Sequence, residues 1–214
     1  KKLIKFGGGF YCGLIDGIQG HEPLYAFNGF FMQMRSKYVE EGASIYWYSV
    51  EWDAKATSWE DFRDEILGST DPTTAPASSL RGQVLENWEK LGLSSVPNVG
   101  DNGVHGSASP FEAMCERMNW MGASIEGDAF GKELLAAGIS KETIKTWSLD
   151  PQVSYGSKNC PIKASLFDSL ENTDTDMCVA LSTIINSGLQ PKGDVSVSSP
   201  SSSPPSSISS NMLP

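Results

Sequence analysis

Histidine, basic residues and long apolar runs are scarce in this sequence. Its 214 residues include two histidines, and 16 lysines and arginines stand against 26 aspartates and glutamates, for a formal net charge of −10 at pH 7. No basic run is longer than Lys1–Lys2, so we expect no nucleic-acid partner and no polybasic membrane patch. A run of about 18 apolar residues is also missing, which predicts that there is no transmembrane segment.

Cysteine is rare and irregularly spaced. The four cysteines form no Cys-x-x-Cys pair and stand at positions 12, 115, 160 and 178. This pattern predicts free thiols in a reducing compartment, in preference to a disulfide framework or a zinc site. No targeting peptide is visible, and because the sequence starts at Lys1 we expect a processed or trimmed N-terminus.

The sequence does contain several well-marked helix starts within a chain whose apolar content of 39% is enough for one packed core. Ser58 and Ser109 each have an acidic residue three positions later, and Pro110 occupies the first helical position. Asp128 begins another short helical pattern. Helices are expected at residues 25–42, 58–68, 84–93, 109–121, 128–138, 140–147 and 174–187, and strands at 1–15 and 43–52.

One of the two histidines, His105, lies in the stretch "DNGVHGSASPFE" between two glycines and just before the helix that starts at Ser109. A helix N-terminus favours an anion nearby. An isolated histidine can equally be a satisfied turn or core residue. The surrounding residues, however, are of the types that contact phosphate or orient an imidazole. They are Thr70, Arg81, Asn102, Ser107 and Glu116.

Two motifs in this region resemble the nucleoside diphosphate kinase family. The family signature is an asparagine, two residues and then His-Gly-Ser, which "NGVHGSAS" reproduces. Upstream, the family has Gly-x-Thr-x-Pro and a short loop ending in Arg-Gly, as in "GSTDPTTAPASSLRG". A glutamate and a tryptophan follow on the next helix, as Glu116 and Trp120 do here. The resemblance covers about residues 24–125.

The resemblance implies an α+β fold, a ferredoxin-like sandwich in which helices pack on a four-stranded antiparallel sheet. The implied reaction moves the γ-phosphate of a nucleoside triphosphate to a nucleoside diphosphate through a phosphohistidine, with Mg²⁺ bound through the nucleotide phosphates. His105 would be the nucleophile, oriented by Glu116 and Ser107. The nucleotide would be held by four residues: Thr70 and Arg81 at the phosphates, Asn102 at the sugar, and Phe31 or its neighbour Phe30 stacked on the base.

The sequence departs from the family pattern in three places. The Lys-Pro-Asp that ends the family's first strand is absent, so that strand and its helix are expected to lie upstream of Lys1 or to be missing. The family's second phosphate-contacting arginine falls on Asp64, with Arg63 one position away, a rotation of about 100° on an α-helix. The stretch "ENWEKLGLSSVPNV" is an insertion before Asn102.

Two functions therefore stay open. One is an active nucleoside diphosphate kinase, and the other is a kinase-like module that serves as a structural or binding subunit of a larger assembly. A homo-oligomer is compatible with either function. The expected location is cytoplasmic, cytoskeletal or flagellar, with an organelle as the alternative if a transit peptide has been removed.

Three parts of the chain are expected. Residues 1–150 would form the kinase-like domain, and residues 151–193 an extended docking segment with one helix at 174–187. Residues 194–214 are a Ser/Pro-rich tail with too few apolar side chains to offset the entropic cost of ordering. The helix at 174–187 has two possible roles: it lies in a groove of a larger assembly, or it packs back on the body.

Overall fold

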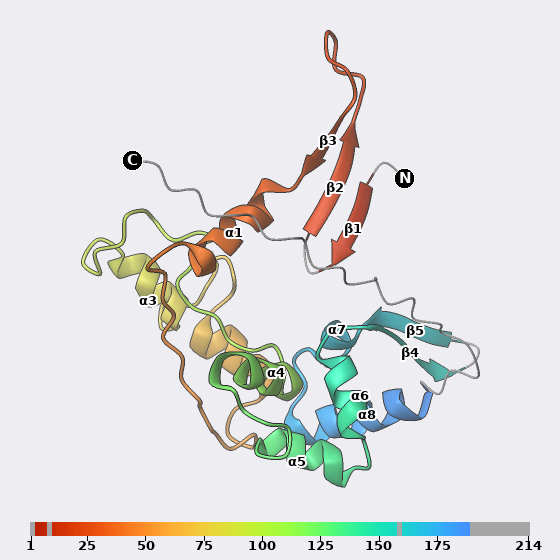
Figure 1. Cartoon of the computed structure of the whole chain (residues 1–214). Coiled ribbons are helices and arrows are strands. Elements are labelled where there is room, and N and C mark those ends of the chain that lie inside the picture. Colours follow the sequence, from red (N-terminus) through yellow and green to blue (C-terminus); the bar gives the residue numbers. More distant parts are fainter. Residues whose placement is uncertain (1–2, 8–9, 158–159, 189–214) are drawn as a thin grey trace, which may run out of the picture.

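The structure is a computed structural model, and it describes residues 3–7, 10–157 and 160–188. The chain begins with strands and helices in the order β1 (Leu3–Gly7), β2 (Phe10–Ile15), β3 (Leu24–Phe27), α1 (Gly29–Val39), α2 (Trp59–Asp61), η1 (Phe62–Leu67) and α3 (Leu80–Asn87). It continues with α4 (Pro110–Met121), α5 (Ala129–Ala136), α6 (Lys141–Trp147), β4 (Gln152–Ser157), β5 (Cys160–Ser165), α7 (Leu166–Leu170) and α8 (Thr175–Gly188). Figure 1 shows that β1, β2 and β3 stand apart from the helical body.

Polar side chains cap α2, α4, α5 and α6 at the places that the sequence predicts, whereas α3 begins at Leu80, four residues before the predicted start at residue 84. The Ser58 hydroxyl oxygen accepts a hydrogen bond from the backbone N–H of Asp61, and the Asp61 carboxylate accepts one from the backbone N–H of Ser58. Ser109 caps α4, with Pro110 in the first helical position. Asp128 caps α5 by accepting from two backbone N–H groups. The predicted helices at 109–121, 128–138 and 140–147 are confirmed. Their start signals are local, since each cap depends on residues within one helical turn.

The strands form two antiparallel sheets, so the predicted α+β class is confirmed. The first sheet has the order β1-β2-β3, with Cys12 opposite Phe27, and the second is the hairpin β4-β5. Within the described residues the strands are thus divided between a three-stranded and a two-stranded sheet, where the resemblance implied one sheet of four strands.

The strand predicted at residues 43–52 is wrong. This stretch lies in no strand or helix, and the side chains of Tyr46 and Tyr48 are 89% and 84% exposed. Alternating apolar residues favour a strand only where a second strand offers hydrogen bonds and a surface to pack on. No strand of the described chain pairs with this stretch.

The hydrophobic core lies between the helices of the second half of the chain. Its buried members are Phe111, Met114, Ile125, Phe130, Leu134, Ile139, Ile144, Trp147, Val153, Leu166, Leu170, Cys178 and Ile185. The Phe111 ring meets Trp147 and Phe167 edge to face, with ring centroids 6.1 and 5.8 Å apart. Helix α4 therefore has one face in the core, which fixes the direction of its opposite face.

Residues 151–193 were expected to form an extended docking segment with one helix, and the described part of this segment instead contains β4, β5, α7 and α8. Five of their side chains belong to the core cluster: Val153, Leu166, Leu170, Cys178 and Ile185. Of the two roles left open for the helix at 174–187, packing on the body is the one observed. The rest of the expected docking segment and the Ser/Pro-rich tail, residues 189–214, lie outside the described residues.

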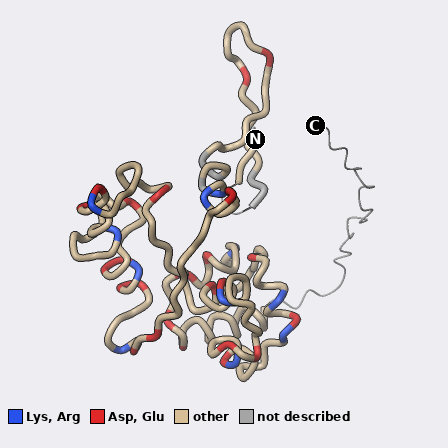
Figure 2. Tube along the Cα trace, turned by 60° about the vertical axis from the view of Figure 1, so that its left-hand side comes forward, with Lys and Arg blue, Asp and Glu red and all other residues tan. Residues whose placement is uncertain are grey.

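Charged residues are spread over the described chain, as Figure 2 shows, with acidic and basic residues interspersed along the body. No helix of the described residues is both long enough and apolar enough to span a bilayer.

Candidate functional site

The loop that carries His105 is fixed by Arg81, the second residue of α3. The Arg81 guanidinium donates one hydrogen bond to the carbonyl oxygen of Val104, at 2.8 Å, and another to the carbonyl oxygen of Gly68. Gly82 follows in the helix, where a Cβ would clash with the carbonyl oxygen of Pro76. The Arg-Gly pair of the sequence motif thus has a packing reason for its glycine.

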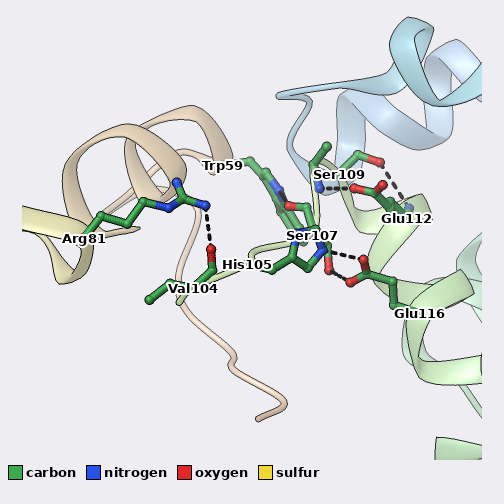
Figure 3. A network of polar contacts seen from close by, with 9 residues as sticks. Trp59, Arg81, Val104, His105, Ser107, Ser109, Glu112 and Glu116 are labelled. Atoms are coloured by element: carbon green, nitrogen blue, oxygen red, sulfur yellow. Dashed lines mark hydrogen bonds and ion pairs between the residues drawn. The ribbon is translucent and has the colours of Figure 1, made fainter. Parts of the chain in front are cut away.

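His105, Ser107 and Glu116 come together as the sequence predicts (Figure 3). The Nε2 atom of His105 lies 2.5 Å from one carboxylate oxygen of Glu116. The hydroxyl of Ser107 donates to the other oxygen, also over 2.5 Å. Glu116 is in the second turn of α4, on the side away from the buried Phe111. Because Glu116 engages Nε2, the nitrogen that it leaves for other chemistry is Nδ1.

The charges around this group set its protonation. The hydrogen bond to Glu116 raises the pKa of His105 above its ordinary value, against the lowering effect of burial and of Arg81. Burial alone would raise the pKa of Glu116, but the hydrogen bonds from His105 and Ser107 hold it below its ordinary value. The imidazole side chain is nevertheless 62% exposed, so a ligand can reach it.

Glu112 closes the loop against the start of α4. Its backbone N–H donates to the Ser109 hydroxyl oxygen at 3.1 Å, and its carboxylate accepts from the backbone N–H of Ala108. Burial raises the pKa of the Glu112 carboxyl. The result is a reciprocal cap that holds residues 108 and 109, and hence Ser107, at a fixed distance from the helix.

Asn102 joins the two sequence motifs. Its side-chain amide donates to the carbonyl oxygen of Thr70 at 3.0 Å, and its amide oxygen accepts from the backbone N–H of Val104 at 3.3 Å. Thr70 itself is exposed. The structure therefore brings Thr70 and Asn102 to the same edge of the site as Arg81, although the Asn102 side chain is used within the protein.

The Arg81 side chain also makes hydrogen bonds within the protein. Its two Nη atoms donate to backbone carbonyls, and its Nε atom is buried without a hydrogen-bond partner among the described residues. Burial lowers the pKa of Arg81, and the charge of Arg63 lowers it further. The positive charge of Arg63 therefore lies close enough to Arg81 to affect the pKa of its guanidinium.

Arg63 lies in the π-helical stretch η1. Its guanidinium contacts the Glu171 carboxylate at 2.9 Å and the side-chain oxygen of Asn172. Arg63 is thus held by the turn that precedes α8.

Phe31 lies in α1, and its side chain, like that of Phe30, is outside the described part of the structure. Stacking of a base on Phe31 stays a prediction. Helix α1 does approach the site, because Lys37 Nζ lies 3.0 Å from an Asp101 carboxylate oxygen. Tyr38 also stacks on Trp120 at the end of α4, with ring centroids 6.4 Å apart.

The sequence analysis did not identify two residues of this region, Trp59 and Asp174, as part of the site. Trp59 donates through its indole Nε1 to the carbonyl oxygen of Ser107 at 2.8 Å, and its own backbone N–H donates to Asp174 at 2.8 Å. These contacts join positions 48 and 115 residues apart. No local signal marks them, since Trp59 reads as a residue of a first helical turn and Asp174 as the start of a terminal helix.

Among the described residues, no group of three or more His, Cys, Asp or Glu side chains is arranged to hold a metal ion. Three cysteines, Cys12, Cys115 and Cys178, are free thiols as expected.

Comparison with known proteins gives no match to the chain from any protein-family model, any curated protein or any solved structure.

Proposed function

We propose that this protein transfers a phosphoryl group from a nucleoside triphosphate to a nucleoside diphosphate through a phosphohistidine at His105. One observation carries the proposal: Glu116 and Ser107 engage one side of the imidazole, at Nε2, while the ring stays exposed to solvent. A nucleophilic imidazole needs this arrangement, in which a base fixes the tautomer and leaves the second nitrogen free to attack.

In the first step the Nδ1 lone pair attacks the γ-phosphorus, the bond to the bridging oxygen breaks, and the diphosphate leaves with that electron pair. The proton on Nε2 stays in the hydrogen bond to Glu116, whose negative charge stabilises the positive ring. In the second step a β-phosphate oxygen of an acceptor diphosphate attacks the phosphorus and the N–P bond breaks. Atoms and electrons balance without any redox reactant.

The phosphate charge is offset by groups around the loop. Arg81 binds the loop at Val104, and Arg63 lies close enough to Arg81 to affect its pKa. Arginine suits phosphate because its planar fork binds two oxygens at once. Each arginine must leave a present partner, a carbonyl for Arg81 and Glu171 for Arg63, to do so. Mg²⁺, which arrives with the nucleotide, would neutralise part of the phosphate charge.

The alternative is a kinase-like binding or structural subunit that does not turn over. The hydrogen bonds of Arg81 to two backbone carbonyls favour it, because an arginine used to close the loop is less available to a nucleotide. In that case nucleotide binding and phosphorylation would both be weak, while the fold would still need Arg81.

Incubation with γ-labelled ATP and Mg²⁺ tests the proposal. Wild-type protein should gain an acid-labile, base-stable label, and His105→Ala should not. The chain offers a matched control, since His21 is the other histidine and lies outside the site; His21→Ala should label like wild type. Equal labelling of wild type and His105→Ala, or no labelling of wild type, would overturn the assignment.

Titration with ADP separates the two functions further. Arg81→Ala should weaken binding by about 1.5–3 kcal/mol if the guanidinium contacts phosphate. Arg81→Lys keeps the charge and loses the fork, so it should recover only part of the affinity. Circular dichroism of both variants shows whether the loop closure by Arg81 is needed for folding. A variant that is folded and binds ADP like wild type would favour the structural subunit.

A further inference from the structure

A series of hydrogen bonds, joined through the residues Trp59 and Ser107, links Asp174 at the start of α8 to His105. The Asp174 carboxylate accepts from the backbone N–H of Trp59, at 2.8 Å, and the Trp59 indole donates to the carbonyl oxygen of Ser107, at 2.8 Å. The Ser107 hydroxyl donates to Glu116, which holds His105. Figure 3 shows Trp59 beside Ser107 and His105. The first two links are not used in the reaction proposed above.

The indole of Trp59 is held in place by other aromatic rings. Its centroid lies 4.9 Å from that of Trp52, and Trp52 stacks on Phe62 with centroids 4.4 Å apart. Trp52 is itself tied to the carbonyl oxygen of Thr57 by its indole N–H, at 2.9 Å. The Trp59 N–H therefore points in one direction, toward the loop that carries Ser107.

Asp174 is fixed on the other side by the core. It stands between the buried Leu170 and Cys178, and its carbonyl oxygen accepts from the backbone N–H of Cys178 at 2.8 Å. Its carboxylate does not cap its own helix; it binds the N–H of Trp59, one of the first-turn donors of α2 that have no partner within that helix. Next to it, the backbone N–H of Asn172 donates to the carbonyl oxygen of Ala108 at 2.8 Å.

We propose that Trp59 is a positioning residue for His105 and that Asp174 positions Trp59. This inference rests on the proposed function, and it gives Asp174, just before α8, a part in phosphoryl transfer. Trp59 touches no reacting atom. By holding the backbone of Ser107 it aims the Ser107 hydroxyl at Glu116, and so fixes the carboxylate that sets the tautomer and tilt of the imidazole.

The Trp59→Phe variant tests the indole contact, because it keeps an aromatic ring and removes the N–H donor. The rate of His105 phosphorylation by ATP should fall about tenfold or more, since small errors in the placement of a nucleophile are costly. The affinity for ADP should stay within about twofold, because Trp59 does not contact the nucleotide. A wild-type rate in this variant would overturn the proposal.

Two substitutions of Asp174 test its hydrogen bond to Trp59, because one of them keeps the acceptor oxygen. Asp174→Asn keeps a side-chain oxygen that can accept from the Trp59 N–H, and Asp174→Ala removes it. The phosphorylation rate should therefore fall in Asp174→Ala and stay close to wild type in Asp174→Asn. Equal losses in both variants would mean that the charge and not the hydrogen bond matters, and would contradict the proposed link.

A measurement that needs no turnover keeps this proposal separate from the proposed function. The imidazole of His105 is titrated by NMR and assigned with His105→Ala; the charged groups facing it are Glu112 and Glu116 of α4 and Arg81 of α3. In Trp59→Phe its pKa should move toward that of free imidazole. If wild type takes no label from ATP, the proposed function fails, and this shift still decides the role of Trp59.

Trp147→Phe is the control for a general loss of stability. Trp147 is 3% exposed in the core and packs on Phe111, so this variant should melt at a lower temperature. Its phosphorylation rate and the pKa of His105 should equal those of wild type. If it slows phosphorylation as much as Trp59→Phe does, the effect of Trp59 is only structural and the proposal is wrong.

Discussion

Arg117 and Asp128 form a two-point ion pair that joins α4 to α5. Arg117 Nε lies 2.6 Å from Asp128 Oδ2, and Nη2 lies 3.0 Å from Oδ1. The same Oδ1 atom accepts from the backbone N–H groups of Phe130 and Gly131 at 2.9 and 3.1 Å. Because Arg117 directly follows Glu116 in α4, this pair also fixes the helix turn that holds His105.

The first prediction concerns Asp128→Ala. The substitution removes a helix cap and leaves Arg117 without its carboxylate, so the free energy of unfolding should fall by about 3 kcal/mol. Asp128→Asn keeps an oxygen for the cap and should cost about half as much. Urea denaturation measures both. Equal stability of Asp128→Ala and wild type would show that the pair contributes nothing.

The same pair has a predictable pH dependence. Burial alone would raise the pKa of Asp128, but its hydrogen bonds with Arg117 and Gly131 hold it below the ordinary value. A carboxyl with a depressed pKa in the folded state contributes stability above its ordinary pKa. That contribution is lost as the pH falls through the depressed value. Acid denaturation should therefore begin at a higher pH in Asp128→Asn than in wild type.

The helices could be predicted because their signals are local. Ser109 with Pro110, and Asp128, mark helix starts within a few residues, and the structure has α4 and α5 there. A strand depends on a distant partner, so the alternation at residues 43–52 was not sufficient, and β4 and β5 were missed although each residue of β4 pairs with one in β5. The hairpin has mixed polar and apolar residues and gives no strong periodic signal.

In the candidate site too, contacts between residues near in sequence could be predicted and contacts between distant residues could not. His105, Ser107 and Glu116 lie within twelve positions of one another, and the spacing of a loop and the following helix is enough to place them together. Trp59 and Asp174 reach the same loop through contacts that only the folded core creates. The partners of Arg63 could not be predicted either, because they depend on a π-helical stretch and on the turn before α8.

The second prediction is a shift of the pH profile in Glu116→Gln. The hydrogen bond with the Glu116 carboxylate raises the pKa of His105, so its loss should lower that pKa. Only the neutral imidazole can accept a phosphoryl group. In wild type the rate of labelling should therefore fall as the pH drops through the raised pKa, and in Glu116→Gln this fall should occur at lower pH.

The maximal rate of Glu116→Gln should also drop, on the order of a hundredfold, because an amide stabilises the positive ring much less than a carboxylate does. Pre-steady-state labelling with γ-labelled ATP from pH 5 to pH 9 measures both quantities. A profile that does not move would show that Glu116 does not control the protonation of His105.

The third prediction concerns thiol reactivity. Burial raises the pKa of Cys115 to about 12 and that of Cys178 to about 11. Since the thiolate is the reactive form, both should resist iodoacetamide at pH 8 in the folded protein and react once urea has unfolded it. Peptide mapping by mass spectrometry assigns each site. Rapid labelling of Cys178 in the folded protein would mean that α8 leaves the core.

The last prediction tests the packing of α8 with two neighbouring residues. Ile185 is fully buried in the core cluster, whereas Ile184, one position earlier, is 52% exposed. Ile185→Ala should lower the free energy of unfolding by about 2–5 kcal/mol because it leaves a cavity, and Ile184→Ala should cost well under about 1 kcal/mol. The two variants have the same composition and the same change in intrinsic helix propensity, so the propensity effect cancels in the comparison. Thermal and urea unfolding of the isolated protein measure the difference. If α8 instead served a partner and left the body, both substitutions would have the same small effect on the isolated protein, and the larger loss would be seen only in the assembly.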